Sequence, residues 1–190
     1  MRIGLGRKSL MLFAFVAFMA AAMAADEPKQ AEKTSKDIPL ELKDFKFKLS
    51  NPDQRDLFVF NEDEQKLCFY SNGAAEAKFK IPADGDYDLI INASGDSAMN
   101  IRPKFKLVLD DKPDDKGLSK ENSLKSDDAK DYKFTMALKT GAHKLSIAFT
   151  NDTYKEGENH SNFYVHGAKF TPHKPDVAKK AESSENPKAK

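Results

Sequence analysis

The sequence contains no tryptophan and only one cysteine, Cys68, among its 190 residues. A single cysteine cannot form an intramolecular disulfide, so the hydrophobic core must stabilise the fold. Cys68 lies in the apolar run 67–70, which favours a small buried side chain over a reactive thiol. No segment keeps apolar residues at helical spacing over three turns, and this argues against an α-helical architecture.

Motifs that carry common enzyme chemistry are also missing. The sequence has no Gly-rich phosphate loop leading into a helix, no G-x-S-x-G, no H-E-x-x-H and no cysteine pair for zinc. Acidic residues are plentiful, so a carboxylate pair for glycoside hydrolysis stays open as an alternative. However, a domain this small rarely builds the deep groove that such a pair needs. We therefore expect a protein that is not an enzyme.

A strong net charge is lacking as well. The chain carries 31 Lys and Arg against 30 Asp and Glu, a formal net charge of +1. Attraction to a nucleic acid needs clustered positive charge, which releases counterions from the phosphates. The balanced composition therefore does not predict a nucleic-acid partner.

The one long apolar run lies near the start, from Leu10 to about Met23, after the basic residues Arg2, Arg7 and Lys8. Ala-Met-Ala before residue 25 is a small-residue cleavage site, so residues 1–25 are predicted to be a signal peptide. The run is too short for a membrane-spanning helix. We expect a secreted or periplasmic protein with no membrane association after cleavage and a net charge of about −2, because three basic residues are removed.

Composition divides the remaining chain into three parts. Residues 26–43 and 173–190 are rich in Lys, Glu, Pro, Ala and Ser, so they are predicted to be a disordered linker and a disordered tail. Residues 44–172 are long enough for one domain with its own core. The segment 110–131 interleaves lysines with carboxylates and is predicted to be a mobile surface loop. We expect a monomer.

Between these ends, apolar and polar residues alternate in short runs separated by turn signals such as Ser71-Asn-Gly73 and Thr140-Gly141. Short strands with no helix between them predict antiparallel sheets, and their one-sided alternation predicts two sheets packed face to face. The expected fold is all-β, an antiparallel β-sandwich of the jelly-roll type. The candidate strands are 45–49, 57–60, 67–70, 75–81, 87–93, 104–110, 132–138, 144–150 and 163–170.

The loop between the last two candidate strands, residues 150–162, is crowded with side chains that carry oxygen. Hard cations such as Ca²⁺ take about six to eight oxygen ligands, so the loop could form a cation cage. Its spacing does not match an EF-hand. The alternative is an ordinary solvated turn in which Asn and Asp satisfy their own backbone.

Residues from about 71 to 170 resemble a calcium-dependent carbohydrate-binding module, the xylan-binding type appended to bacterial xylanases. The resemblance rests on several short segments in chain order, the most specific being Phe149-Thr-Asn-Asp152 followed by a second asparagine, Asn162. The others are Ser71-Asn-Gly73, Pro82-Ala-Asp-Gly-Asp-Tyr87, Ile90-Ile-Asn-Ala-Ser-Gly95, Met99 to Pro103, Thr140-Gly-Ala-His-Lys-Leu145 and Asn162-Phe-Tyr-Val165.

The resemblance implies a β-sandwich that holds Ca²⁺ between its last two strands, where the ion coordinates vicinal sugar hydroxyls. Asp152 is then the strongest metal-ligand candidate, with Asn151 beside it. The family has an Asp-Arg pair before the second asparagine, whereas this chain has His160-Ser161. The missing aspartate removes a negative ligand, and imidazole suits a hard cation poorly. Glu158 or Asn159 could take its place.

The sugar-binding candidates are Tyr154, His160 and Asn162. Tyr164 could flank a sugar or simply cover the sandwich, while Asp96 and Asn100 lie in a loop that resembles one near the family's site. Because the chain has no tryptophan to stack on a sugar ring, a calcium-bridged diol would supply the affinity.

Two functions fit this sequence. The first is a secreted, non-catalytic module that binds a xylan-like or other β-linked polysaccharide through a Ca²⁺-coordinated sugar diol. The second is an exported structural or adhesion β-sandwich with a degenerate metal site.

Overall fold

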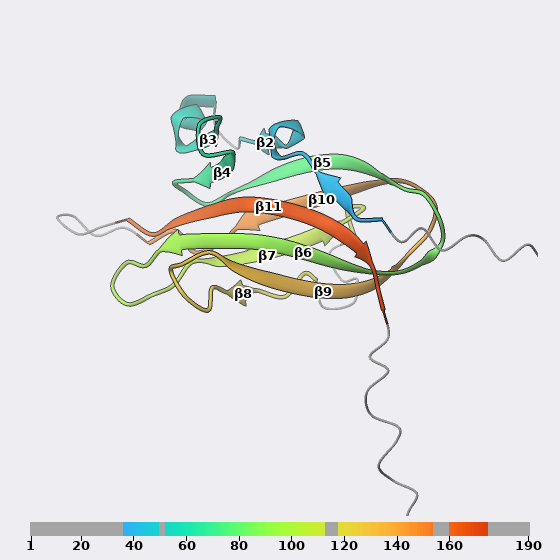
Figure 1. Cartoon of the computed structure of the whole chain (residues 1–190). Coiled ribbons are helices and arrows are strands. Elements are labelled where there is room, and N and C mark those ends of the chain that lie inside the picture. The colour runs from blue at the N-terminus through green and yellow to red at the C-terminus, as the bar shows by residue number, and fades with distance from the viewer. Residues whose placement is uncertain (1–35, 50–51, 113–117, 154–159, 175–190) are drawn as a thin grey trace, which may run out of the picture. The chain divides into compact units, whose positions relative to one another are not determined.

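A computed structural model of the chain describes residues 36–49, 52–112, 118–153 and 160–174. Two antiparallel sheets form the fold, as the alternating pattern predicts, and Figure 1 shows one sheet lying over the other. The six-stranded sheet contains β3 (Phe58–Asn61), β4 (Lys66–Phe69), β11 (Asn162–Pro172), β6 (Gly85–Asp96) and β9 (Lys130–Leu138) in that order, with β1 (Ile38–Leu40) paired to β11. The five-stranded sheet contains β2 (Lys46–Lys48), β5 (Gly73–Ile81), β10 (Gly141–Phe149), β7 (Lys104–Leu109) and β8 (Asn122–Ser123).

All nine strands expected from the alternation are present, several of them longer than predicted. Two short 3-10 helices complete the described part, η1 (Leu42–Asp44) and η2 (Pro52–Leu57). No helix among the described residues is long and apolar enough to cross a membrane.

The core lies between the sheets and is rich in phenylalanine. Phe163 of β11 stacks on Phe105 of β7, with ring centroids 5.3 Å apart, and on Phe149 of β10, at 5.9 Å. Phe69 of β4 packs against the same ring at 5.5 Å. All four rings are at most 2% exposed. Each burial of this kind contributes roughly 1.5–3 kcal/mol, so a contiguous core of this size stabilises the sandwich without a disulfide.

The predicted linker 26–43 overlaps the sandwich, so its boundary at residue 43 is wrong. Residues 38–40 form β1, which pairs with Lys169 and its neighbours on β11. Leu40 and Leu42 are 7% and 8% exposed and belong to the core. Three apolar residues at alternate positions, Ile38, Leu40 and Leu42, drive this packing, although charged neighbours mask them in the composition. Residues 1–35 and 175–190 lie outside the described part.

The segment predicted to be a mobile surface loop, 110–131, is only partly a surface loop. Leu118 and Leu124 are buried at 5% and 2% exposure. β8 pairs with β7, and the backbone N–H of Leu124 donates to the carbonyl of Pro103 at 2.9 Å. Two leucines among many charges are enough to anchor this segment to the core. Residues 113–117 lie outside the described part.

Candidate functional site

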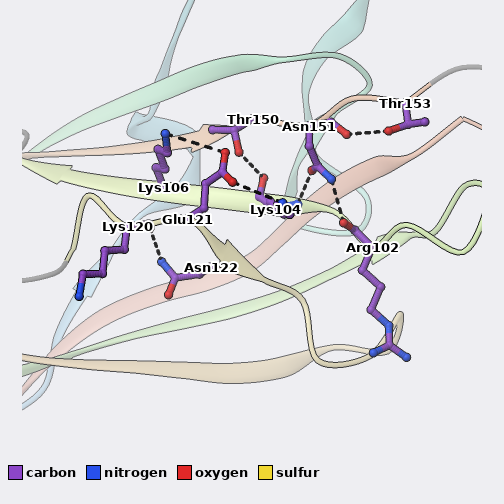
Figure 2. A network of polar contacts seen from close by, with 9 residues as sticks. All are labelled: Arg102, Lys104, Lys106, Lys120, Glu121, Asn122, Thr150, Asn151 and Thr153. Atoms are coloured by element: carbon purple, nitrogen blue, oxygen red, sulfur yellow. Dashed lines mark hydrogen bonds and ion pairs between the residues drawn. The ribbon is translucent and has the colours of Figure 1, made fainter.

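Asn151 follows the end of β10 and joins it to the chain segment that enters β7 (Figure 2). Its side-chain Oδ1 accepts a hydrogen bond from the backbone N–H of Lys104, and its Nδ2 donates to the carbonyl of Arg102 at 2.9 Å. Thr150 adds a third link, because its Oγ1 donates to the Lys104 carbonyl at 3.2 Å. The Asn151 amide is therefore engaged at both ends, and only the second lone pair of its Oδ1 is left for a metal.

Asp152 comes next and is positioned through its backbone. Its N–H donates to Oδ1 of Asn72, just before β5, at 2.7 Å. Its carboxylate Oδ1 is buried, and no group in the described part of the chain hydrogen-bonds to it. A buried polar atom without a partner costs about 1–3 kcal/mol, so native proteins almost always satisfy it. A bound cation would supply the missing partner for this oxygen.

Ser161 closes the neck of the loop that follows Asp152. It is fully buried, and its Oγ accepts a hydrogen bond of 2.8 Å from the N–H of Thr153. The N–H of Ser161 donates in return to the Thr153 carbonyl at 3.1 Å. Ser161 stands at the second position of the pair where this chain departs from the family pattern. It therefore ties the two sides of the loop together where the family has an arginine.

An open groove of about 770 Å³ lies at this end of the sandwich. Two of the three sugar-binding candidates, His160 and Asn162, line it, and the third, Tyr154, lies outside the described residues. Five further residues complete the lining: Leu57, Tyr70, Asp96, Ser97 and Asp127. The groove thus combines acidic and amide groups with one aromatic ring.

Asp96, at the end of β6, organises the polar groups of the groove. Its Oδ2 accepts hydrogen bonds from Nδ2 of Asn162 at 2.9 Å and from the hydroxyl of Tyr164 at 2.7 Å. Burial, together with the hydrogen bond to this carboxylate, raises the pKa of Tyr164 well above its usual range. The phenol therefore stays protonated at physiological pH and keeps donating to Asp96.

Aromatic rings flank these groups. The Tyr70 and Tyr164 rings meet edge to face with centroids 6.2 Å apart, and the Lys66 ammonium lies 4.5 Å from the Tyr164 centroid. The ring of Tyr164 is thus covered by a cation, whereas Tyr70 is 36% exposed. Tyr70 is the only tyrosine among the described residues that line the groove.

Tyr70, Ser97 and Asp127 are groove residues that the sequence analysis missed. In the sequence, Tyr70 looks like the last residue of an ordinary strand. Asp127 lies in a charge-rich segment, far in sequence from the loop 150–162. Their proximity arises from long-range pairing: the carbonyl of Asp127 accepts from the N–H of Gly95 at 3.2 Å, beside Asp96. No local pattern in the sequence signals this contact.

A complete metal cage is not visible in the described part of the chain, since no three His, Cys, Asp or Glu side chains converge there. Asp152 fits the role of a ligand because of its unpartnered buried oxygen. Two other predicted ligands, Glu158 and Asn159, lie outside the described residues. Among the described residues, one carboxylate therefore fits the role of a ligand to a hard cation. It belongs to Asp152, in the loop that follows β10.

A family model described as "Ca-dependent carbohydrate-binding module xylan-binding" matches residues 88–185, which include Asp96, the loop after β10 and the whole of β11. The chain belongs to this family of carbohydrate-binding modules. The match confirms the resemblance seen in the sequence. A comparison with curated proteins found no match.

Solved structures similar to this chain include other carbohydrate-binding modules. The CBM36-1 domain of a multidomain xylanase from the hindgut metagenome of Trinervitermes trinervoides has a TM-score of 0.50 and 10% identity, over 73% of this chain and 98% of that one. The mannan-binding module from Man5C gives 0.47 and 15%, over 70% and 97%. The GH26-CBM35 β-(1,4)-mannanase of Podospora anserina gives 0.49 and 13%, over 74% of this chain but only 28% of the mannanase. The likeness to the first of these supports the β-sandwich fold of the module.

Proposed function

We propose that this protein is a secreted or periplasmic, non-catalytic module that binds a xylan-like or other β-linked polysaccharide in the groove beside Asp96. The proposal is supported by membership of a carbohydrate-binding family and by the groove, whose polar groups and exposed Tyr70 ring suit a sugar. Asp96, Asn162 and His160 offer acceptors and donors for sugar hydroxyls, and Tyr70 offers a ring face.

We further propose that Asp152 is a ligand for Ca²⁺ at the neck of the loop. The observation that carries this step is the buried Oδ1 of Asp152 without a hydrogen-bond partner in the described residues. A bound Ca²⁺ with open coordination positions would accept two adjacent sugar hydroxyls in place of water. Glu158 and Asn159, which follow in the same loop, are the candidates for further protein ligands.

A thermal melt in excess CaCl₂ and in excess EDTA tests the metal. A ligand that binds only the folded state at 100 times its Kd adds about 2.7 kcal/mol of stability, which raises the Tm of a domain of this size by several degrees. We expect such a shift for the natural chain and none for Asp152→Asn, which removes the charge but keeps the size of the side chain. Asp86→Asn is the matched control, because Asp86 lies at the end of β6 away from Asp96 and the groove. This variant should keep the calcium-dependent rise in Tm.

Binding to xylan is then measured by affinity electrophoresis with and without calcium. Retardation that needs calcium and is lost in Asp152→Asn supports the whole proposal. Retardation that survives EDTA keeps the polysaccharide function but overturns the metal. A folded protein that shows neither a calcium shift nor glycan binding overturns both.

The structural or adhesion alternative draws on two observations. The Asn151 amide is engaged with the backbone around β7, and Ser161 occupies a position at which the family has a charged residue. In both cases the side chain of the loop is used to hold the backbone by hydrogen bonds. A glycan array run with calcium separates the two functions, because a scaffold without a site binds none of the array.

A further inference from the structure

The outer face of the five-stranded sheet carries a concentration of lysine that the groove does not use. Apolar residues at alternate positions of these strands point into the core, so the residues between them point outward. The outward charged side chains of β2, β5, β7 and β10 comprise a single acid, Glu76, and seven lysines, which we call the basic face: Lys46, Lys48, Lys78, Lys80, Lys104, Lys106 and Lys144.

The register of the sheet brings these lysines close together. Lys78 lies directly opposite Lys144 in the β5–β10 pairing. Lysines two residues apart on one strand are about 6.8 Å apart at their backbones, and neighbouring strands are separated by about 4.8 Å. Like charges in directly opposed positions destabilise a sheet. Folding stability alone therefore does not explain this arrangement.

Acidic partners neutralise only part of the basic face. Glu76 contacts Lys48 at 2.6 Å and Lys144 at 3.6 Å, while Asp111 contacts Lys144 at 2.5 Å. Glu121 contacts Lys104 at 3.4 Å and Lys106 at 3.9 Å. Figure 2 draws both contacts as dashed lines. By contrast, Lys46, Lys78 and Lys80 form no ion pair with any described residue, and all three are exposed.

The other sheet does not share this charge. The outward positions of β4, β6, β9 and β11 include four aspartates, Asp86, Asp88, Asp96 and Asp131, against three lysines, Lys66, Lys133 and Lys169. The near-neutral composition of the chain therefore conceals an uneven distribution of charge, with the excess of lysine on the five-stranded sheet. An anionic polymer is therefore attracted to the basic face more than to the opposite one.

The shape of the basic face suits an extended polymer. The uncharged outward residues between its lysines carry no large side chain: Ala74, Val108, Ala142, Ser146 and Ala148. Every aromatic ring of these strands packs toward the core, so no ring is presented for stacking a neutral sugar or a base. The basic face also lacks arginine, the residue that binds phosphates and bases through bidentate hydrogen bonds. Recognition would rest on point charges that meet single negative groups.

We propose that the basic face is a second, metal-independent binding surface for a polysaccharide that carries carboxylates, such as a polymer of uronic acids. Acidic polysaccharide is favoured over nucleic acid because the chain belongs to a carbohydrate-binding family and the face has neither aromatic rings nor arginine. The surface is separate from the groove beside Asp96, which lies at one end of the other sheet.

The experiment is affinity electrophoresis of the full chain in gels containing sodium polygalacturonate or duplex DNA with EDTA, so that no calcium bridges form, and in gels containing neutral xylan with CaCl₂. The test variant is Lys78→Glu with Lys80→Glu. Glu at position 78 faces Lys144, so the variant should fold. The matched control, Lys43→Glu with Lys130→Glu, makes the same charge change at exposed lysines outside the basic face.

We expect polygalacturonate to retard the natural chain and the control variant in EDTA, with an affinity that falls steeply between 50 and 200 mM salt. The test variant should lose at least about tenfold in affinity, since each close charge contact contributes around 1 kcal/mol or more at low salt. The calcium-dependent retardation by xylan should be the same in both variants.

Three results would overturn the inference: equal loss of polygalacturonate binding in the test and control variants, no binding without calcium, or duplex DNA binding as tight as polygalacturonate. None of them bears on the groove, because neutral xylan reports on that site alone. Failure of xylan binding with polygalacturonate binding intact would overturn the proposed function and leave this inference standing.

Discussion

The hydroxyl of Tyr164 donates a hydrogen bond of 2.7 Å to Oδ2 of Asp96, a residue that lines the groove, and so links β11 to the end of β6. A hydrogen bond to a charged group contributes about 1.5–3 kcal/mol, and somewhat less where water reaches it. Tyr164→Phe and Asp96→Ala should therefore each lower the free energy of unfolding by about 1 kcal/mol. Urea denaturation measures both.

The double variant shows whether these losses arise from one interaction. Because the two groups contact each other, the combined loss should be smaller than the sum of the single losses. Strictly additive losses would mean that Asp96 and Tyr164 act independently.

Ser161→Ala removes the acceptor for the Thr153 N–H at the neck of the loop. An unsatisfied buried donor costs about 1–3 kcal/mol, so we expect a loss of this size in chemical denaturation. Ser146→Ala, on the outer face of β10, makes the same chemical change and should alter stability by less than about 0.5 kcal/mol. Similar losses in the two variants would contradict the role assigned to Ser161.

Gly95→Ala tests how closely β6 approaches β11. A Cβ at this position would meet the carbonyl oxygen of Asn162 as well as side-chain atoms of Pro103 and Leu124 at 2.8 and 2.9 Å. Forcing extra atoms into such a space costs about 1–3 kcal/mol, and the displaced backbone would carry Asn162 out of the groove.

Gly85→Ala, at the other end of the same strand, meets only Tyr87 at 3.7 Å and should fold normally. Thermal melts and xylan binding of the two variants give the comparison. An unchanged Tm for Gly95→Ala would show that the strands can separate there without cost.

Two histidines should give opposite dependences of stability on pH. Burial lowers the pKa of His143, but its hydrogen bonds to Asp110 and to the Lys139 carbonyl, both 2.8 Å, outweigh burial and raise it. The folded state then binds the proton more tightly than the unfolded state, so this stabilisation is complete below a pH of about 6.5 and is lost as pH rises through the folded pKa.

His166 behaves in the reverse way. Burial, followed by the nearby Lys66, lowers its pKa, and its Nε2 lies 2.7 Å from Oγ of Ser94. Its contribution is complete above a pH of about 6.5 and is lost as pH falls through the depressed pKa.

Denaturation of His143→Gln and His166→Gln at pH 5.5 and 8.5 measures both effects. The first variant should lose more stability at pH 5.5, and the second should lose more at pH 8.5. The same pH trend in both variants would contradict one of the two assignments.

Alternation of apolar residues was enough to predict the strands and the two-sheet architecture, because runs such as Leu145, Ile147 and Phe149 have one buried face. It failed for short elements. β1 spans three residues and includes a proline, and β8 spans two, so neither offers a period to detect. Their positions are set by pairing with β11 and β7, which are distant in sequence.

The candidate site was predicted less completely, because its chemistry depends on contacts rather than on residue types. In the sequence, Asn151 and Asp152 are neighbouring candidates to bind a cation, and the resemblance favours Asp152. The structure gives the two side chains different surroundings. The Asn151 amide holds the backbone near β7, whereas Asp152 keeps a buried oxygen that has no hydrogen-bond partner among the described residues. Likewise, Ser161 carries no sequence signal for its place at the loop neck.

The pairing of β1 with β11 determines how the module can be attached to anything else. Ile38 lies beside Phe170, so the chain enters and leaves the sandwich at neighbouring points. Asn162 is eight residues back along β11, about 27 Å away at the spacing of an extended strand. A protein fused before residue 38 or after residue 172 would therefore be joined at the end of β11 away from Asn162, and the end that carries the groove would be left uncovered by the fusion.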